Sequence, residues 1–298
     1  MDARSNLRAI LLMVGSMAAF AIEDMFVKFV AVDMPTGQIL MFLGLGGIPV
    51  FGWLAHRKGA RVWTRDALHP TVIWRNAGEV IGTWGFITAL ALVPLATVSA
   101  ILQAMPLAVT FGAALFLGES VGWRRWTAIL VGFCGVLMVI RPGFSGFDAN
   151  ALWALLAVAG LSLRDLATRR VPRTVSSTQL SVWGFAAVAL LGGAMLAVSG
   201  GAVWPEPLQI LWLACALTGG IVGYWAITEA MRLGEVATVT PFRYARLVFA
   251  LIIGILVFGE RPDSATLLGA ALIIASGLYT FARERRLKRA LSMNAATQ

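Results

Sequence analysis

Two short stretches of sequence decide the fold of this chain: GEVIGTW at residues 78–84 and GGIVGYW at residues 219–225. Each has two glycines four residues apart and ends in tryptophan, and an offset of 141 residues separates the two stretches. The chain is therefore predicted to contain two homologous halves, residues 1–145 and 146–298. The same offset links other pairs of uncommon residues: Asp24 with Asp165, Lys28 with Arg169, Gln38 with Gln179, Gly118 with Gly259, and Glu119 with Glu260.

The composition places these halves in a membrane. Of the 298 residues, 59% are hydrophobic and 13% are charged, about half the charged share of a soluble domain. This composition excludes an ordinary soluble enzyme, a disordered chain and a secreted disulfide scaffold. Long continuous apolar runs also exclude an outer-membrane barrel. Ten segments are predicted to cross the bilayer as helices, at residues 7–30, 37–55, 71–92, 96–117, 126–140, 149–168, 177–199, 207–231, 236–258 and 264–282.

The predicted fold class is an all-α polytopic membrane protein with ten transmembrane helices arranged as two inverted five-helix repeats. Each half contains an odd number of helices, so the second half enters the membrane from the opposite side to the first. Inverted repeats are typical of secondary transporters, whose substrate site lies near the bilayer midplane between the repeats. The first segment begins like a signal peptide, but its counterpart in the second half favours a retained helix.

The basic residues predict the orientation. The net charge is +9, and most of the 24 Lys and Arg residues fall in loops and tails on the side of the N-terminus. Lys28, Arg141 and Arg261 fall on the other side. Cytoplasmic loops carry the excess of Lys and Arg, so both termini are expected in the cytoplasm.

Charged residues within the apolar segments are the strongest functional signal, because charge in the bilayer interior is costly. Lys28, Arg75 and Arg164 lie near helix ends, where their charged groups can extend to the membrane surface. Others lie deeper, and arginine suits a carboxylate while glutamate or an aromatic face suits an ammonium. A cavity for a zwitterion is therefore predicted, lined by Glu79, Thr83, Trp84, Gln103, Tyr224, Trp225, Glu229, Arg243, Tyr244 and Arg246.

Further residues are predicted to assist transport without forming the cavity. Candidates for coupling or gating are Glu23, Asp24 and Asp165. Small residues four apart allow helices to approach closely in lipid. We therefore expect equivalent helix contacts at Gly78, Gly82, Gly219 and Gly223, while Glu119 and Glu260 are expected to brace turns.

Signals for catalysis or metal binding are missing from the sequence. There is no Walker motif and no HExxH motif, and His56 and His69 fall in a predicted loop without metal-ligand partners. Cys134 and Cys215 are isolated in apolar segments. We expect no enzyme activity, no cofactor, no metal and no nucleic-acid partner. The predicted partners are the lipid bilayer and a small-molecule substrate, with the protein as a monomer.

The repeated Gly-Glu pairs at 118–119 and 259–260, each followed by a last helix, resemble the drug/metabolite transporter superfamily. The small-residue stretches ATVSA at 96–100 and ATVTP at 237–241 resemble the start of the fourth helix of its EamA-type repeat. Length and layout resemble the YddG-like amino-acid exporters in particular. The resemblance implies a central cavity, the bacterial inner membrane, and export of amino acids or related metabolites. Residues 20–23 read FAIE where many relatives have Trp-Gly-x-Asn.

Alternatives remain open at the level of sequence. Multidrug efflux of organic cations would require carboxylates to dominate the cavity, and Arg243 and Arg246 argue against it. A membrane scaffold subunit without transport activity would have all its deep charges neutralised in pairs. For a transporter, the same residues are compatible with proton coupling and with facilitated diffusion.

Overall fold

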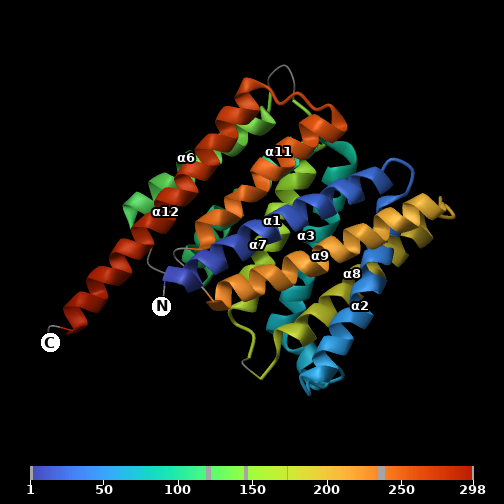
Figure 1. Ribbon diagram of the computed structural model, residues 1–298, viewed down its shortest axis with the longest axis horizontal. Coiled ribbons are helices and arrows are strands. Elements are labelled where there is room, and N and C mark those ends of the chain that lie inside the picture. The colour runs from blue at the N-terminus through green and yellow to red at the C-terminus, as the bar shows by residue number, and fades with distance from the viewer. Residues whose placement is uncertain (1–2, 119–121, 144–146, 173, 234–238, 297–298) are drawn as a thin grey trace.

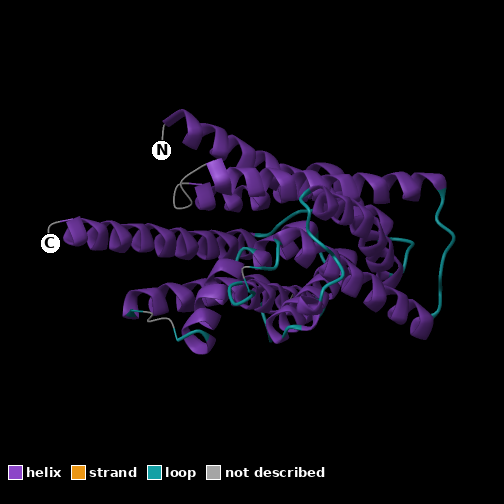
Figure 2. Cartoon of the chain, turned by 90° about the horizontal axis from the view of Figure 1, so that it is seen from below, coloured by secondary structure: helices purple, strands orange, loops and turns teal. Residues whose placement is uncertain are grey.

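A computed structural model describes residues 3–118, 122–143, 147–172, 174–233 and 239–296. Within these ranges every regular element is a helix (Figures 1 and 2). The α-helices are α1 (Ala3–Val30), α2 (Thr36–Arg57), α3 (Pro70–Leu92), α4 (Leu95–Leu102), α5 (Met105–Phe116), α6 (Trp123–Ile140), α7 (Ala151–Thr168), α8 (Ser177–Ser199), α9 (Pro207–Leu233), α11 (Ala245–Phe258) and α12 (Ser264–Ala296). Two short 3-10 helices are η1 (Arg65–Leu68) and η2 (Thr240–Tyr244).

Nine helical segments in the described residues are long and apolar enough to cross a membrane. They match nine of the ten predicted segments and confirm the prediction of an all-helical polytopic membrane protein. The remaining predicted segment, 71–92, forms α3, which is not among the nine. The first half of α3 carries Arg75, Asn76 and Glu79, which lower the mean hydropathy of this segment.

The helices associate mainly in four pairs: α1 with α9, α3 with α7, α2 with α8, and α6 with α12. Figure 1 shows α6 and α12 side by side at one edge of the bundle and α2 with α8 at the opposite edge. The C-terminal part of α12 extends beyond the bundle in both views (Figures 1 and 2). Each pair joins a helix of the first half of the chain to a helix of the second half.

Glycines allow two of these pairs to approach closely. A Cβ atom at Gly78 would lie 2.5 Å from the backbone nitrogen of Arg164, and one at Gly82 would lie 2.7 Å from the Leu161 side chain. On α9, a Cβ at Gly219 would lie 3.1 Å from the Ala19 carbonyl oxygen, and one at Gly223 would lie 2.9 Å from the Phe20 ring. In lipid, the hydrophobic effect does not drive helices together. Close van der Waals contact of this kind is therefore a main source of their association.

Two membrane segments are interrupted near their N-terminal ends. The expected helix 96–117 divides into α4 and α5 around Gln103 and Ala104, just before Pro106. The segment 240–258 begins as the 3-10 helix η2, which contains Pro241, and continues as α11. Proline lacks the backbone N–H and its ring displaces the preceding turn, which explains both interruptions. The Gln103 side-chain nitrogen donates to the Tyr244 carbonyl oxygen at 3.2 Å, so the two interruptions contact each other.

Candidate functional site

Four charged side chains form an ion cluster between α3 and α7, which we call the α3–α7 cluster. The Glu79 carboxylate lies 2.6 Å from the Arg75 guanidinium, one helical turn away, and 3.3 Å from the Arg164 guanidinium. Arg164 also pairs with Asp165 at 2.9 Å. Arg75 donates a further hydrogen bond to the Leu180 carbonyl oxygen on α8 at 3.0 Å. Arg75 and Arg164 were expected to extend to the membrane surface, but the structure directs both to Glu79 inside the bundle.

A second ion pair joins α1 to α11. The Arg246 guanidinium donates from Nη2 to both oxygens of Asp24 at 2.8 Å, and its Nε lies 3.2 Å from Oδ2. Asp24 is fully buried, and the Arg246 side chain is 23% exposed. The Phe20 and Phe86 rings lie 5.3 and 5.5 Å from the guanidinium carbon, within the range of cation–π attraction. Arg246 is therefore held on several sides, as a buried charge must be.

Three predicted site residues lack such partners. Among the described residues, no carboxylate lies within ion-pair distance of Arg243, and no hydrogen bond holds the carboxylates of Glu23 or Glu229. Arg243, on η2, is exposed, while Glu23 and Glu229 are half-buried. The charges of Asp165, Arg164 and Arg246 are close enough to act on Arg243, and those of Asp24 and Arg246 act on Glu23. Arg246 therefore lies within electrostatic reach of both Arg243 and Glu23.

The remaining predicted cavity residues occupy different surroundings. Gln103 and Tyr244 are buried and bonded to each other, as described above. Trp84 stacks at a tilt on Trp153 with ring centroids 5.3 Å apart. Trp225 is 58% exposed, and the Tyr224 ring packs against the Phe51 ring of α2 in a T-shaped arrangement with centroids 5.3 Å apart. Thr83 lies one helical turn from Glu79 on α3.

At the other end of the bundle, Glu260 braces the junction between α3 and α4. Its carboxylate accepts hydrogen bonds from the Leu95 and Ala96 backbone N–H groups at 2.6 and 3.0 Å. Lys28 lies 3.9 Å from Glu260 and donates to the Leu90 and Val93 carbonyl oxygens at the end of α3. The structure thus places Glu260 as the predicted brace, although the groups it holds lie in the first half of the chain. Glu119 lies outside the described residues.

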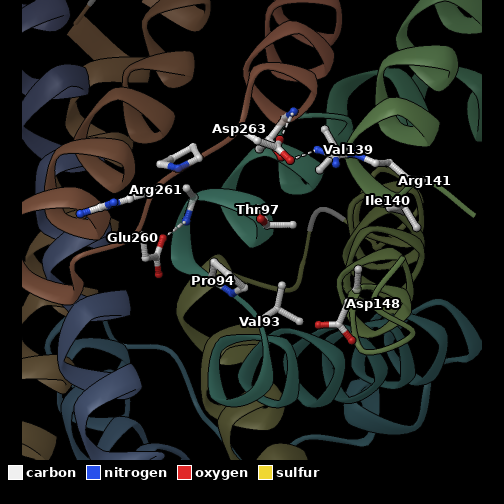
Figure 3. Close-up of a pocket in the computed structure, with 14 residues that line it drawn as sticks. Val93, Pro94, Thr97, Val139, Ile140, Arg141, Asp148, Glu260, Arg261 and Asp263 are labelled. Carbon is white, nitrogen blue, oxygen red and sulfur yellow. Dashed lines mark hydrogen bonds and ion pairs between the residues drawn. The ribbon is translucent and has the colours of Figure 1, made fainter. Parts of the chain in front are cut away.

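A pocket of about 340 Å³ opens at this same end, beside the brace (Figure 3). No residue predicted to line the substrate cavity belongs to it. Its walls come from the α3–α4 junction, the end of α6, the start of α7 and the turn between α11 and α12. Its lining residues are Val93, Pro94, Ala96, Thr97, Val139, Ile140, Arg141, Asp148, Ala151, Glu260, Arg261, Pro262, Asp263 and Thr266.

Arg141 in this pocket has an unusual backbone conformation. It caps the C-terminus of α6 with φ 55° and ψ 51°, in the left-handed region. That conformation costs a residue with a side chain about 1–2 kcal/mol. The Arg141 guanidinium forms an ion pair with Asp263 at the start of α12, and such solvent-exposed pairs contribute only about 0–1 kcal/mol. The pair therefore does not offset the backbone strain by itself.

The bond to Arg141, followed by the Thr266 backbone N–H, lowers the pKa of Asp263 to about 2. Asp263 is therefore ionised at every physiological pH, and its pairing with Arg141 persists there. The hydropathy pattern of the sequence places Arg141 only in a loop. Its signal was present in the sequence, since an arginine followed by Pro142 stands at a helix end where glycine is favoured.

Helices that cross a membrane and enclose ion pairs contributed by α1, α3, α7 and α11 define a multi-pass membrane protein with a polar interior. Comparison with known families assigns the class. The chain belongs to the EamA-like transporter family, whose model matches residues 7–141 and again residues 149–282. This confirms the resemblance to EamA-type transporters seen in the sequence and the prediction that the protein is a transporter and not an enzyme.

Three curated relatives illustrate the family. The riboflavin transporter of Rhizobium johnstonii is 29% identical over 220 residues, which cover 72% of each chain. The S-adenosylmethionine uptake transporter of Rickettsia prowazekii is 22% identical over 273 residues, 91% of each chain. The pseudopaline exporter of Pseudomonas aeruginosa is 27% identical over 274 residues, 90% of this chain and 93% of the relative. Because these names differ in cargo and direction, the substrate has to be argued from the site.

Proposed function

We propose that this transporter exports amino acids or related zwitterionic metabolites by alternating access, with the substrate bound between Arg243 and Glu23. The proposal rests on one observation: some charged residues inside the bundle have ionic partners and others do not. Arg75, Glu79, Arg164, Asp165, Asp24 and Arg246 have ionic partners, whereas no described residue pairs with Arg243 or Glu23. An unpaired charge within a membrane segment is costly unless it faces water or a ligand.

Two of the three unpaired groups, Arg243 and Glu23, suit the two ends of an amino acid. The Arg243 guanidinium offers paired N–H donors that match a carboxylate, and the Glu23 carboxylate accepts from an ammonium. The bidentate Arg246–Asp24 pair lies within electrostatic reach of both and has almost no net charge of its own. A zwitterion would therefore supply a partner for each of these two charges without displacing an existing ion pair. An organic cation would satisfy Glu23 and leave Arg243 unpaired.

The proposed architecture is ten transmembrane helices, α3 included, in two inverted repeats at residues 1–145 and 146–298. The helix pairs support it: exchanging the two halves converts the α1–α9 pair into the α7–α3 pair and leaves α2–α8 and α6–α12 unchanged. The family model also matches each half separately. The bond between Gln103 and Tyr244, which occupy equivalent positions of the halves, favours a pseudo-two-fold axis near these residues.

The same equivalence explains why Glu23 is unpaired. Glu23 and Arg164 are equivalent positions, and so are Gly220 and Glu79. Arg164 meets Glu79, whereas Glu23 faces Gly220, where a Cβ atom would lie 2.8 Å from its Oε1. Glycine at position 220 leaves the Glu23 carboxylate without the partner that its counterpart has. We propose that the substrate ammonium occupies this position during transport.

Both termini are proposed to lie in the cytoplasm of a bacterial cell, with the chain in the inner membrane. The distribution of Lys and Arg supports this orientation. An exporter among the relatives supports outward transport, although another relative is named for uptake. Alternating access is reversible, so the gradients across the membrane set the direction.

The test is counterflow in proteoliposomes with a panel of labelled amino acids. Wild-type protein is expected to exchange at least one of them, and Arg243→Ala should lower that rate by about tenfold or more, since a charge-assisted hydrogen bond contributes about 1.5–3 kcal/mol. Arg65→Ala, an exposed arginine before α3, is the matched control and should retain the wild-type rate. No exchange of any amino acid, or exchange of organic cations alone, would refute the proposal. The response to an imposed pH gradient then distinguishes proton coupling from facilitated diffusion.

A further inference from the structure

The pocket beside Glu260 lies apart from the proposed central site, at the end of the bundle opposite the N-terminus. It contains charges of both signs, Arg141 and Arg261 against Asp148, Glu260 and Asp263, on walls that are otherwise largely apolar. A volume of about 340 Å³ falls within the range of small-molecule sites. Arg141 and Asp148 each have a hydrogen-bonding atom without a hydrogen-bond partner among the described residues.

Arg141 is the first of these residues. The ends of the helices that precede Gly118 and Gly259 use glycine in the left-handed conformation, whereas the end of α6 uses Arg141. Its guanidinium binds Asp263, but its Nε is buried and has no hydrogen-bond partner among the described residues. Arginine carries five N–H donors in a planar fork, and a carboxylate is the group that matches this fork. Arg141 thus lines the pocket and keeps a donor that the ion pair leaves unused.

Asp148 is the second residue. It is exposed at the start of α7, and its Oδ1 accepts the Asn150 backbone N–H at 2.9 Å. No described residue donates a hydrogen bond to its Oδ2. Figure 3 shows the Asp148 carboxylate across the pocket from the Arg141–Asp263 pair, with Thr97, Pro94 and Val93 along one side. The pocket therefore has the Arg141 guanidinium on one side, the Asp148 carboxylate on the other and apolar residues such as Val93 and Pro94 in its lining.

We propose that this pocket is a second binding site for a small zwitterion, with Arg141 holding its carboxylate and Asp148 its ammonium. The substrate would bind here after it leaves the central site. The class of ligand is therefore that of the transported substrate, and this inference rests on the proposed function. Asp263 keeps the Arg141 guanidinium oriented, and Val93, Val139 and Ile140 contact the apolar part of the ligand.

The test uses the full chain in lipid nanodiscs, where both ends of the bundle are accessible. Cys134→Ala and Cys215→Ala remove the native thiols, and Thr97→Cys places a single reporter thiol in the pocket. Its rate of reaction with a charged methanethiosulfonate is measured with and without an equimolar mixture of the standard amino acids. Acetate and methylammonium at the same concentrations are the control, since each supplies only one of the two charges.

The amino-acid mixture is expected to slow modification by about tenfold at ten times the dissociation constant. Acetate and methylammonium should protect far less. Asp148→Asn should abolish protection while keeping the Oδ1 that accepts the Asn150 N–H. Arg141→Gln combined with Asp263→Asn should also abolish it, and this double variant leaves no unpaired charge that could impair folding.

Three outcomes would overturn this inference: a thiol at position 97 that does not react, a rate that the mixture leaves unchanged, or protection that persists in both variants. Wild-type counterflow separates this failure from that of the proposed function. Exchange of amino acids without protection refutes only the second site. Protection without exchange refutes the proposed transport and leaves a binding pocket.

Discussion

Individual charged residues in this transporter have distinct tasks that follow from their partners. Asp24 is fully buried and is bound by Arg246, so its charge is needed to keep that arginine inside the bundle. Removing one member of a buried ion pair costs more than the pair contributes, because the remaining charge stays buried without compensation. Arg243 has no such bond to a described residue, and it is the residue proposed to bind the substrate carboxylate.

Asp24→Asn is therefore expected to destabilise the protein. We expect a loss of about 3 kcal/mol, at the low end of the range for buried pairs because the Arg246 side chain is 23% exposed. Thermal unfolding of the purified protein in detergent would measure it. Asp33→Asn, at an exposed aspartate after α1, is the control and should change the free energy of unfolding by less than about 0.5 kcal/mol. Equal midpoints for the two variants would contradict the assigned role of the Asp24–Arg246 pair.

The sequence identified most interior charges, because a charged residue in an apolar segment is conspicuous. It did not identify their partners. Asp24 and Arg246 are 222 residues apart, and their contact depends on how α1 and α11 are rotated about their axes. It also did not place Phe20 and Phe86 beside Arg246, because aromatic residues are common in apolar segments and do not indicate which residue they contact. Arg141 was missed because its conformation, and not its hydropathy, makes it unusual.

At the scale of elements, the α3–α7 pair depends on glycines on both helices. A Cβ atom at Gly160 would lie 2.3 Å from the Gly82 backbone nitrogen, a distance that side-chain movement cannot relieve. The sequence indicated Gly82 through its repeated spacing. Its partner Gly160 belongs to no such repeated motif, so the structure was needed to show which helix the glycines face.

Gly160→Ala is expected to separate α3 from α7 and to disturb the α3–α7 cluster. Overpacking of a close contact costs about 1–3 kcal/mol, and a backbone contact favours the upper end. The variant should unfold at a lower temperature and should transport more slowly. Gly52→Ala is the matched control, since Gly52 also lies within a helix and a Cβ atom there would meet nothing within 4 Å. If both alanine variants unfold at the same temperature, the close contact is not what holds these helices together.

At the scale of the whole molecule, the offset of 141 residues relates the two halves of the chain, which the family model matches separately. In the proposed inverted repeat, the halves that pair α1 with α9 and α3 with α7 would exchange conformations, and the substrate site would then open to the other side of the membrane. We propose that the substrate carboxylate binds Arg243 between these halves. This contact predicts energetic coupling between the Arg243 guanidinium and the substrate carboxylate.

The most direct measurement compares transport of the amino acid identified by counterflow with transport of the amine that lacks its carboxylate, in wild type and in Arg243→Ala. Wild-type protein should prefer the amino acid by about tenfold or more, as expected for one charge-assisted hydrogen bond. In the Arg243→Ala variant this preference should largely disappear, because the residue that recognises the carboxylate is gone. An undiminished preference for the amino acid in Arg243→Ala would contradict the account.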